Sequence, residues 1–275
     1  MVIEKSMQKG VRIRKIIGQD LPLDPHKNVA GVAVLSLLKE LKSNEGFEIE
    51  IYKNIKPGSG IGSSAASSTG AVYGVNKLLG APLTRKQLIR HAIKGEKIAS
   101  GVEHADNVAP ALLGGFTLVR SYDPLDVLKI HTPASLFVTV IHPQIEVKTA
   151  DARDILKSNI PLKKAIKQWG NLAGFITGLY TEDYDLIGRS MQDVIVEPIR
   201  SLLIPAFDTV QKNSIEAGAL GCGISGSGPS IFTLCKGQNT AQKVAEAIQK
   251  TYQNVGIDYD IHIAPINLEG VKINT

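Results

Sequence analysis

The spacing of apolar and polar residues along the chain predicts short strands alternating with amphipathic helices. Residues 47–52 alternate apolar and polar side chains, as a strand with one buried face does. Residues 240–255 place apolar side chains three and four apart, which is the period of a helix with one buried face. Residues 136–141 are all apolar or small, so we expect a central, covered strand there.

Capping signals and chain breakers extend this pattern to the whole chain. Asn28 and the Thr84–Gln87 capping box predict helix starts. The expected strands span residues 11–17, 47–52, 116–119, 127–131, 136–141, 230–234 and 257–264. The expected helices span residues 28–41, 63–79, 84–99, 107–113, 149–156, 161–178, 183–193, 205–216 and 240–255.

Prolines divide this series into two parts. Pro124 and Pro133 flank a loop and a short strand, and we place a domain boundary near Pro133. We therefore expect an α+β protein with an N-terminal domain over residues 1–132 and a C-terminal domain over residues 133–275. The chain is long enough for two hydrophobic cores.

A glycine-rich loop from Pro57 to Ala66 joins the 47–52 strand to a helix that begins near Ser63. Such a loop lets backbone N–H groups approach a ligand, and a helix N-terminus adds free N–H donors and partial positive charge. Together they predict an anion site, most often for phosphate. Ser63 follows Gly62 where a Walker loop has lysine, and a dinucleotide loop would have glycine there. A tightly packed turn that binds nothing is the alternative.

A second glycine loop covers residues 221–229 and formally contains G-x-G-x-x-G. It leads through Pro229 into a strand, whereas a dinucleotide fold needs a helix there. The loop is therefore either a tight turn or a segment that closes over the first loop.

Four further places carry candidate chemistry, each with a structural alternative. Glu96 is either functional or a solvated helix carboxylate, and Asp106 or Asn107 could simply cap the helix from Val108. Arginine binds carboxylate or phosphate with a planar fork, so Arg153 and Arg200 are candidates, although both could be surface arginines.

Composition excludes several classes of function. The net charge of +5 is dispersed, without a basic and aromatic run typical of nucleic-acid binding. The two cysteines form no CxxC pair, which favours reduced thiols. Early charged residues argue against a signal peptide, and no apolar run approaches a membrane span. No GxSxG elbow is present. We expect a cytoplasmic protein without nucleic-acid or membrane partners.

Taken together, these segments resemble the GHMP small-molecule kinases, and within them the homoserine kinase branch. The resemblance rests on residues 24–28, 57–67, 104–110, 149–153, 197–200 and 223–230. It implies an N-terminal domain of ribosomal-protein-S5 type, a ferredoxin-like C-terminal domain, and an active site between them. It implies transfer of the ATP γ-phosphate to the hydroxyl of L-homoserine in threonine biosynthesis. Dimers are common in the family.

The resemblance also assigns roles to residues. Asn28 would lie near the adenine, Ser64 and Glu96 would hold Mg²⁺, and Asn107 would lie near the reacting hydroxyl. The residues around homoserine would be His104, Asp106, Thr149, Arg153 and Arg200, with Asn107, Glu96 and Arg153 as the catalytic set. The residues around the ATP phosphates would be Pro57, Gly58, Ser59, Gly60, Ile61, Gly62, Ser63, Ser64, Ala65, Ala66 and Ser67.

One family feature has no counterpart in this sequence. The family begins with a strand and a Pro-Ala-Thr/Ser-x-x-Asn segment, and nothing similar precedes Val11. We expect that a complete form starts upstream of Met1, the alternative being a naturally shortened chain. Two other functions stay open: a GHMP kinase for another small alcohol, and a catalytically silent nucleotide-binding paralogue.

Overall fold

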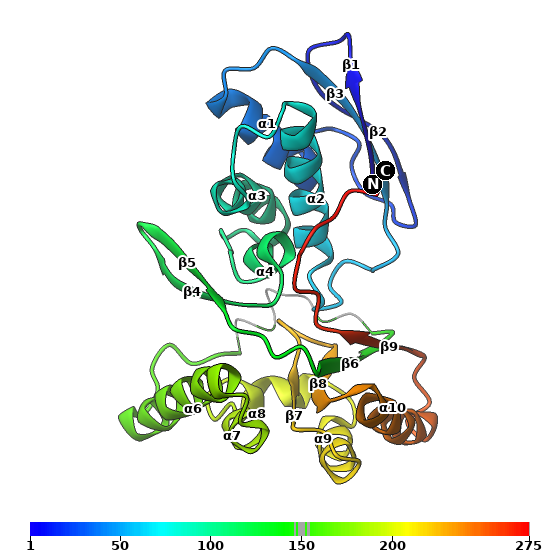
Figure 1. Ribbon diagram of the computed structural model, residues 1–275. Coiled ribbons are helices and arrows are strands. Elements are labelled where there is room, and N and C mark those ends of the chain that lie inside the picture. The colour runs from blue at the N-terminus through cyan, green and yellow to red at the C-terminus, as the bar shows by residue number, and fades with distance from the viewer. Residues whose placement is uncertain (146, 148–151, 153–154, 275) are drawn as a thin grey trace. The chain divides into compact units, whose positions relative to one another are not determined.

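The computed structural model describes residues 1–145, 147, 152 and 155–274, which form two compact units (Figure 1). Unit 1 comprises Met1–Pro57, Gly62–Lys129 and the chain from Asn267 onward. Unit 2 comprises Gly58–Ile61 and Ile130–Ile266. A single boundary near Pro133 does not describe these units fully. Residues 58–61 of the glycine loop belong to unit 2, and the segment from Asn267 onward belongs to unit 1.

Unit 1 is built on a three-stranded sheet with the order β1-β3-β2. The strands are β1 (Val2–Ser6), β2 (Gly10–Ile17) and β3 (Gly46–Tyr52), and β3 pairs antiparallel with β1 and parallel with β2. Phe47, Ile49 and Ile51 are buried on one face of β3. On the other face Arg14 donates to Glu50 at 2.8 Å. The predicted alternation is thereby confirmed.

Helices lie on the apolar face of this sheet in two layers, the first two along the chain against the strands and the next two against those helices (Figure 1). They are α1 (Val29–Glu40), α2 (Ser63–Leu78), α3 (Arg85–Ser100) and α4 (Val108–Leu113), followed by a hairpin of β4 (Phe116–Tyr122) and β5 (Leu125–Ile130). Asn28 accepts from the N–H of Ala30, and Thr84 and Gln87 form the expected capping box. Both predicted helix starts are confirmed.

Unit 2 is an antiparallel sheet with the order β7-β8-β6-β9, which α9 and α10 pack against. Its strands are β6 (Leu136–Pro143), β7 (Gly221–Ile224), β8 (Ile231–Lys236) and β9 (Tyr259–Pro265). Its helices are α6 (Leu162–Thr181), α7 (Tyr184–Ser190), α8 (Glu197–Arg200), the 3-10 turn η1 (Ser201–Leu203), α9 (Phe207–Glu216) and α10 (Gln238–Gln253). Leu136 and Ile141 of β6 are buried, as expected of a central strand.

Several elements differ from the sequence prediction. Strand β1 was not predicted, and β7 forms within the expected glycine turn. Helix α7 ends at Ser190, and Arg200 lies in a short helix rather than between helices. The expected helix over residues 149–156 lies largely outside the described residues.

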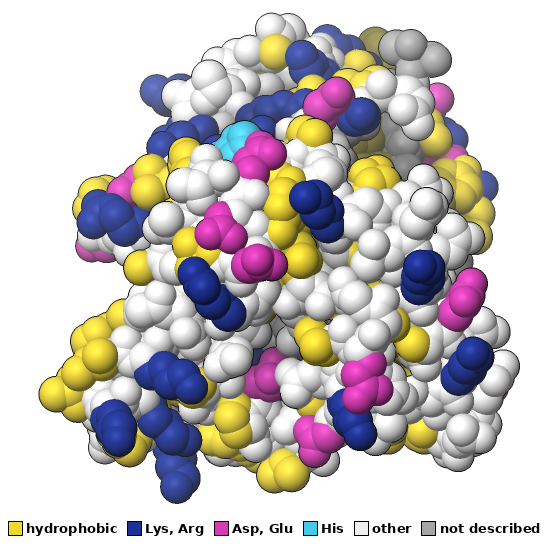
Figure 2. Space-filling view, turned by 60° about the horizontal axis from the view of Figure 1, so that its bottom comes forward, with side chains coloured by type: hydrophobic (Ala, Val, Ile, Leu, Met, Phe, Trp, Pro, Cys, Tyr) yellow, Lys and Arg dark blue, Asp and Glu magenta, His cyan; other side chains and the backbone are white. Residues whose placement is uncertain are grey.

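Charges of both signs are mixed on one face of the molecule. On the face in Figure 2, Lys and Arg side chains lie among Asp and Glu side chains. In the described part of the chain, no helix is both long and apolar enough to cross a membrane.

Candidate active site

The first glycine loop ends at the N-terminus of α2. Gly58, Gly60 and Gly62 all have positive φ, and Gly62 is the N-cap of α2 with φ 75°. A glycine has no side chain with which to cap the helix, so backbone N–H donors of the first turn are left for a ligand. The predicted strand, loop and helix arrangement is present.

The second glycine loop contacts the first one within unit 2. Ser230 donates from Oγ to the carbonyl oxygen of Ser59 at 2.6 Å, and Ser225 donates to that of Gly60 at 3.0 Å. A Cβ atom at Gly60 would lie 2.4 Å from the Ser225 carbonyl oxygen, so only glycine fits there. Behind Ser230, Nδ1 of buried His142 lies 3.1 Å from Oγ. The second loop is thus a direct support for residues 59 and 60.

Glu96 is a buried carboxylate beside the first turn of α2. Ser64 donates to Glu96 at 2.8 Å and Ser68 donates to it at 3.4 Å. Only 5% of Glu96 is exposed, so the alternative of a solvated helix carboxylate is wrong. Burial raises its pKa above the ordinary value, and the hydrogen bonds from Ser64 and Ser68 oppose that rise.

Lys53 is a buried cation that the sequence analysis missed. Its Nζ donates to the Ser63 carbonyl oxygen and to Oγ of Ser67, both at 2.9 Å. Burial lowers the pKa of Lys53, and the charge of Glu96 opposes that change. Its place just after strand β3 and before the glycine loop is the only signal that the sequence offered. The loop therefore has a lysine nearby, although not at the Walker position.

Asp106 and Asn107 lie near the start of α2 in unit 1. Asn107 is the N-cap of α4 but makes no capping hydrogen bond, so the cap interpretation is wrong for its side chain. A Cβ atom on Gly62 would lie 3.6 Å from Oδ1 of Asn107, which places this amide beside the start of α2. Asp106 is exposed, and its charge contributes to the raised pKa of Glu96.

The other predicted site residues have different surroundings. Asn28 is buried, with its amide donating to the Pro22 carbonyl oxygen at 2.9 Å and its oxygen capping α1. Arg200 donates to the carbonyl oxygens of Ala152 and Gly226 in unit 2, at 2.9 and 3.2 Å. Thr149 and Arg153 lie outside the described residues.

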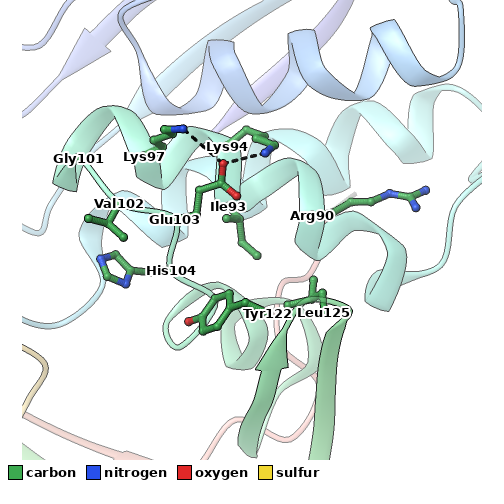
Figure 3. A pocket seen from close by; sticks show the side chains of 10 residues that line it. All are labelled: Arg90, Ile93, Lys94, Lys97, Gly101, Val102, Glu103, His104, Tyr122 and Leu125. Atoms are coloured by element: carbon green, nitrogen blue, oxygen red, sulfur yellow. Dashed lines mark hydrogen bonds and ion pairs between the residues drawn. The ribbon is translucent and has the colours of Figure 1, made fainter.

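A hollow of about 690 Å³ adjoins this region in unit 1 (Figure 3). Of the predicted site residues that the structure describes, His104 alone lines it, beside Tyr122 and Val102. Lys94 and Lys97 both pair with Glu103 there, at 2.7 and 3.7 Å. The charged groups of the hollow are therefore paired with one another, and neither Ser64 nor Glu96 lines it.

Comparison with known proteins identifies the family of this chain. A model of the GHMP kinase N-terminal domain matches residues 28–115, and one of the C-terminal domain matches residues 175–254. The homoserine kinase of Chloroherpeton thalassium is 46% identical over 96% of this chain and 85% of that protein. The chain belongs to the homoserine kinases of the GHMP superfamily.

Other homoserine kinases agree with this assignment. That of Chlorobium phaeobacteroides strain BS1 is 45% identical over 98% of this chain and 88% of its own length. The crystal structure of homoserine kinase from Cytophaga hutchinsonii has a TM-score of 0.94 and 51% identity, covering 98% of this chain and 86% of that one. The α+β GHMP kinase fold expected from the sequence is confirmed.

The homoserine kinase family implies a divalent cation, and the donor set near the loop fits one. Mg²⁺ takes oxygen ligands and usually keeps several waters and substrate phosphates. Ser64 and Glu96 present a hydroxyl and a carboxylate 2.8 Å apart beside the first glycine loop. Over the described residues, no group of three His, Cys, Asp or Glu side chains could hold a metal by itself.

Proposed function

We propose that this chain transfers the γ-phosphoryl group of ATP to the side-chain hydroxyl of L-homoserine, giving O-phospho-L-homoserine for threonine biosynthesis. The observation that carries the proposal is the glycine loop at the start of α2 beside the buried Ser64–Glu96 pair, in a member of the homoserine kinases. The free, buried thiols of Cys222 and Cys235 suit a reducing, cytoplasmic compartment.

The phosphates of ATP would lie along Pro57 to Ser67. Phosphoryl transfer depends mainly on positioning and on neutralising charge. Backbone donors at the start of α2 would bind phosphate oxygens, and Lys53 beneath that turn adds positive charge. Ser64 and Glu96 would hold Mg²⁺, which supplies charge neutralisation at the phosphates.

Homoserine is a zwitterion, so its site needs both signs of charge. We assign Asp106 to the ammonium group, and Arg200 with Arg153 to the carboxylate. His104 and Thr149 would complete the site. Asn107, beside Gly62, would orient the reacting hydroxyl near the loop. Asn28 would contact the adenine as well as capping α1.

This arrangement leaves no dedicated protein base. Asn107 cannot accept a proton, and Asp106 is assigned to the ammonium group. We infer that, as the hydroxyl oxygen bonds to the γ-phosphorus and ADP leaves, the hydroxyl proton passes to an oxygen of the transferred phosphoryl group or to solvent. Asp106→Asn should therefore raise the KM for homoserine with little change in kcat. A variant with normal KM and a much lower kcat would identify Asp106 as the base instead.

A coupled ADP-release assay with L-homoserine tests the function. We expect turnover that requires both homoserine and Mg²⁺, with ³¹P NMR detecting O-phosphohomoserine. Turnover with mevalonate or galactose in place of homoserine would instead support a GHMP kinase for another alcohol. ATP binding in calorimetry without turnover on any acceptor would support a silent nucleotide-binding protein.

A further inference from the structure

Arg200 joins two carbonyl groups of unit 2 that lie far apart in the sequence. Its Nε donates to the carbonyl oxygen of Ala152 at 2.9 Å, and its Nη1 donates to that of Gly226 at 3.2 Å. Ala152 belongs to the 149–153 segment, in which the family resemblance places acceptor-binding residues. Gly226 belongs to the second glycine loop, which supports the first one. Arg200 therefore contacts both a segment of the proposed acceptor site and the support of the proposed nucleotide site.

The short helix α8, which ends at Arg200, is itself held against the second glycine loop. It packs against β7, the strand with which that loop begins (Figure 1). At its first position, Glu197 accepts a hydrogen bond from Nε2 of Gln211 on α9 at 3.0 Å. A Cβ atom on Gly223 would lie 3.5 Å from Oε2 of Glu197, so this carboxyl lies directly beside β7. These contacts fix the position from which Arg200 reaches Gly226.

The second loop contacts the first loop at the residue that follows from this position. A Cβ atom on Gly226 would lie 2.9 Å from the Gly60 carbonyl oxygen, so the two backbones are in contact. The neighbouring Ser225 donates from Oγ to the same oxygen at 3.0 Å. A continuous series of contacts thus runs from Arg200 through residues 225 and 226 to Gly60, and all of it lies within unit 2.

We propose that Arg200 is a positioning residue for the nucleotide loop, in addition to contacting the acceptor carboxylate, and that it couples the binding of the two substrates. The acceptor half of this inference rests on the proposed function. A guanidinium has five N–H groups in a planar fork, and Nη1 carries two of them. A carboxylate bound across Nη1 and Nη2 would share Nη1 with Gly226 and hold the fork in the orientation that supports the second loop.

The coupling has a definite sign. The bond from Nη1 to Gly226 is exposed to solvent, so without a bound carboxylate it holds the loop only weakly. A ligand that orders the guanidinium removes part of the cost of ordering the loop for the second ligand. Each substrate should therefore raise the affinity for the other, and by the same factor in both directions.

Calorimetric binding of Mg²⁺ and AMP-PNP, with and without L-homoserine, tests both halves, because this ATP analogue resists transfer of its terminal phosphoryl group. In the wild type, homoserine should tighten binding of the analogue about fivefold or more. Without homoserine, Arg200→Met should weaken binding of the analogue about threefold or more, and it should abolish the coupling. Arg200→Lys should recover part of the affinity but not the coupling, since a lysine has no fork for a carboxylate.

Two further variants separate the coupling from a merely structural role. Ser225→Ala removes the bond to Gly60 and leaves Arg200 unchanged, so homoserine should still bind alone while the coupling factor falls towards one. Arg189→Met is the matched control, because Arg189 is exposed on α7 of the same unit, and it should leave both affinities and the coupling factor unchanged. A role in stability alone would lower the melting temperature of the Arg200 variants and leave their affinity for the analogue at the wild-type value.

Each half of the proposal has its own contrary result. An unchanged affinity of Arg200→Met for the analogue would overturn the positioning role. A coupling factor of one in a wild-type chain that binds both ligands, or a factor that Ser225→Ala does not reduce, would overturn the coupling and leave the proposed function intact. A wild-type chain that binds the analogue but no homoserine would overturn the acceptor half together with the proposed function, and Arg200→Met would still decide the positioning role.

Discussion

Two buried charged side chains, Glu96 and Lys53, determine the electrostatics at the start of α2. Both approach the first turn of this helix, Glu96 through Ser64 and Lys53 through the Ser63 carbonyl. Burial disfavours the charged form of each, and each charge lowers that cost for the other. A change in the charge of either side chain should therefore shift the pKa of the other.

Replacing Glu96 by glutamine should separate stability from activity. Folding raises the pKa of this carboxyl. Its contribution to the free energy of unfolding therefore falls as the pH increases from the pKa in the unfolded chain to the pKa in the folded chain. Glu96→Gln removes this loss but also removes the charge that offsets the burial of Lys53, so at pH 7 the free energy of unfolding in urea should change little. Its kcat should fall about 100-fold or more, because a Mg²⁺ ligand is lost. A stable variant with wild-type kcat would contradict the metal-binding role.

Replacing Lys53 by methionine should move the pH dependence of activity. Without the lysine charge the pKa of Glu96 rises further, so the acidic limb of the kcat/KM profile should shift to higher pH. Activity lost at neutral pH should return in part under alkaline conditions. Lys86→Met is the matched control, because Lys86 is exposed on α3. An equal shift in both variants would rule out a specific effect.

The sequence predicted the glycine loop of this site but not the burial of the two charged side chains beside it. The glycine loop was predicted directly, since its spacing is local. Glu96 was assigned only by resemblance, because its burial depends on α3 packing against α2. Lys53 had its place before the glycine loop as its one signal, and its burial could not be predicted because its partners lie in the next helix.

The two glycine loops act as one unit through serine hydroxyls. Because the single hydroxyl hydrogen of Ser230 is donated to Ser59, Oγ of Ser230 is the acceptor in its contact with His142, whose Nδ1 carries the hydrogen. Elements with local signals, such as the capped starts of α1 and α3, were predictable from sequence. Strand β7 was not, because Gly221 and Gly223 have low strand propensity and the pairing with β8 decides the outcome.

Ser230→Ala should raise the KM for ATP with a smaller change in kcat. Loss of one hydrogen bond costs about 1 kcal/mol, which corresponds to roughly a fivefold change. Ser36→Ala is the matched control, since Ser36 makes the same kind of bond to His91 at 2.9 Å. It should lower the free energy of unfolding and leave the KM for ATP unchanged. A KM unaffected by Ser230→Ala would mean that the second loop is not needed to position the first.

Unit 1 includes the segment that follows β9, from Asn267 onward. After β9 the chain returns, and the N–H of Val271 donates to the Ala111 carbonyl oxygen at 2.8 Å. Lys129 donates to the Leu268 carbonyl oxygen at 2.8 Å. Local sequence patterns could not predict this return, because its hydrogen bonds to Ala111, Gly115 and Lys129 join residues far apart in the sequence.

Gly270→Ala should destabilise unit 1 more than Gly80→Ala does. Both glycines have positive φ, so both variants carry backbone strain of about 1 kcal/mol. A Cβ atom at Gly270 would also lie 2.6 Å from the Leu112 carbonyl oxygen, whereas Gly80 has open space. We expect the melting temperature to fall by several degrees more for Gly270→Ala than for Gly80→Ala. Equal melting temperatures would show that the C-terminal segment is loosely held.

The support of Ser59 by Ser230 also has a consequence for the order of events during synthesis. The two residues are 171 positions apart, so this contact cannot form until most of the chain has left the ribosome. The loop residues 58–61 emerge early but gain their supporting contacts late. A nascent chain that ends before β8 should therefore bind ATP poorly, and nucleotide-binding competence should arise in a single late step of translation.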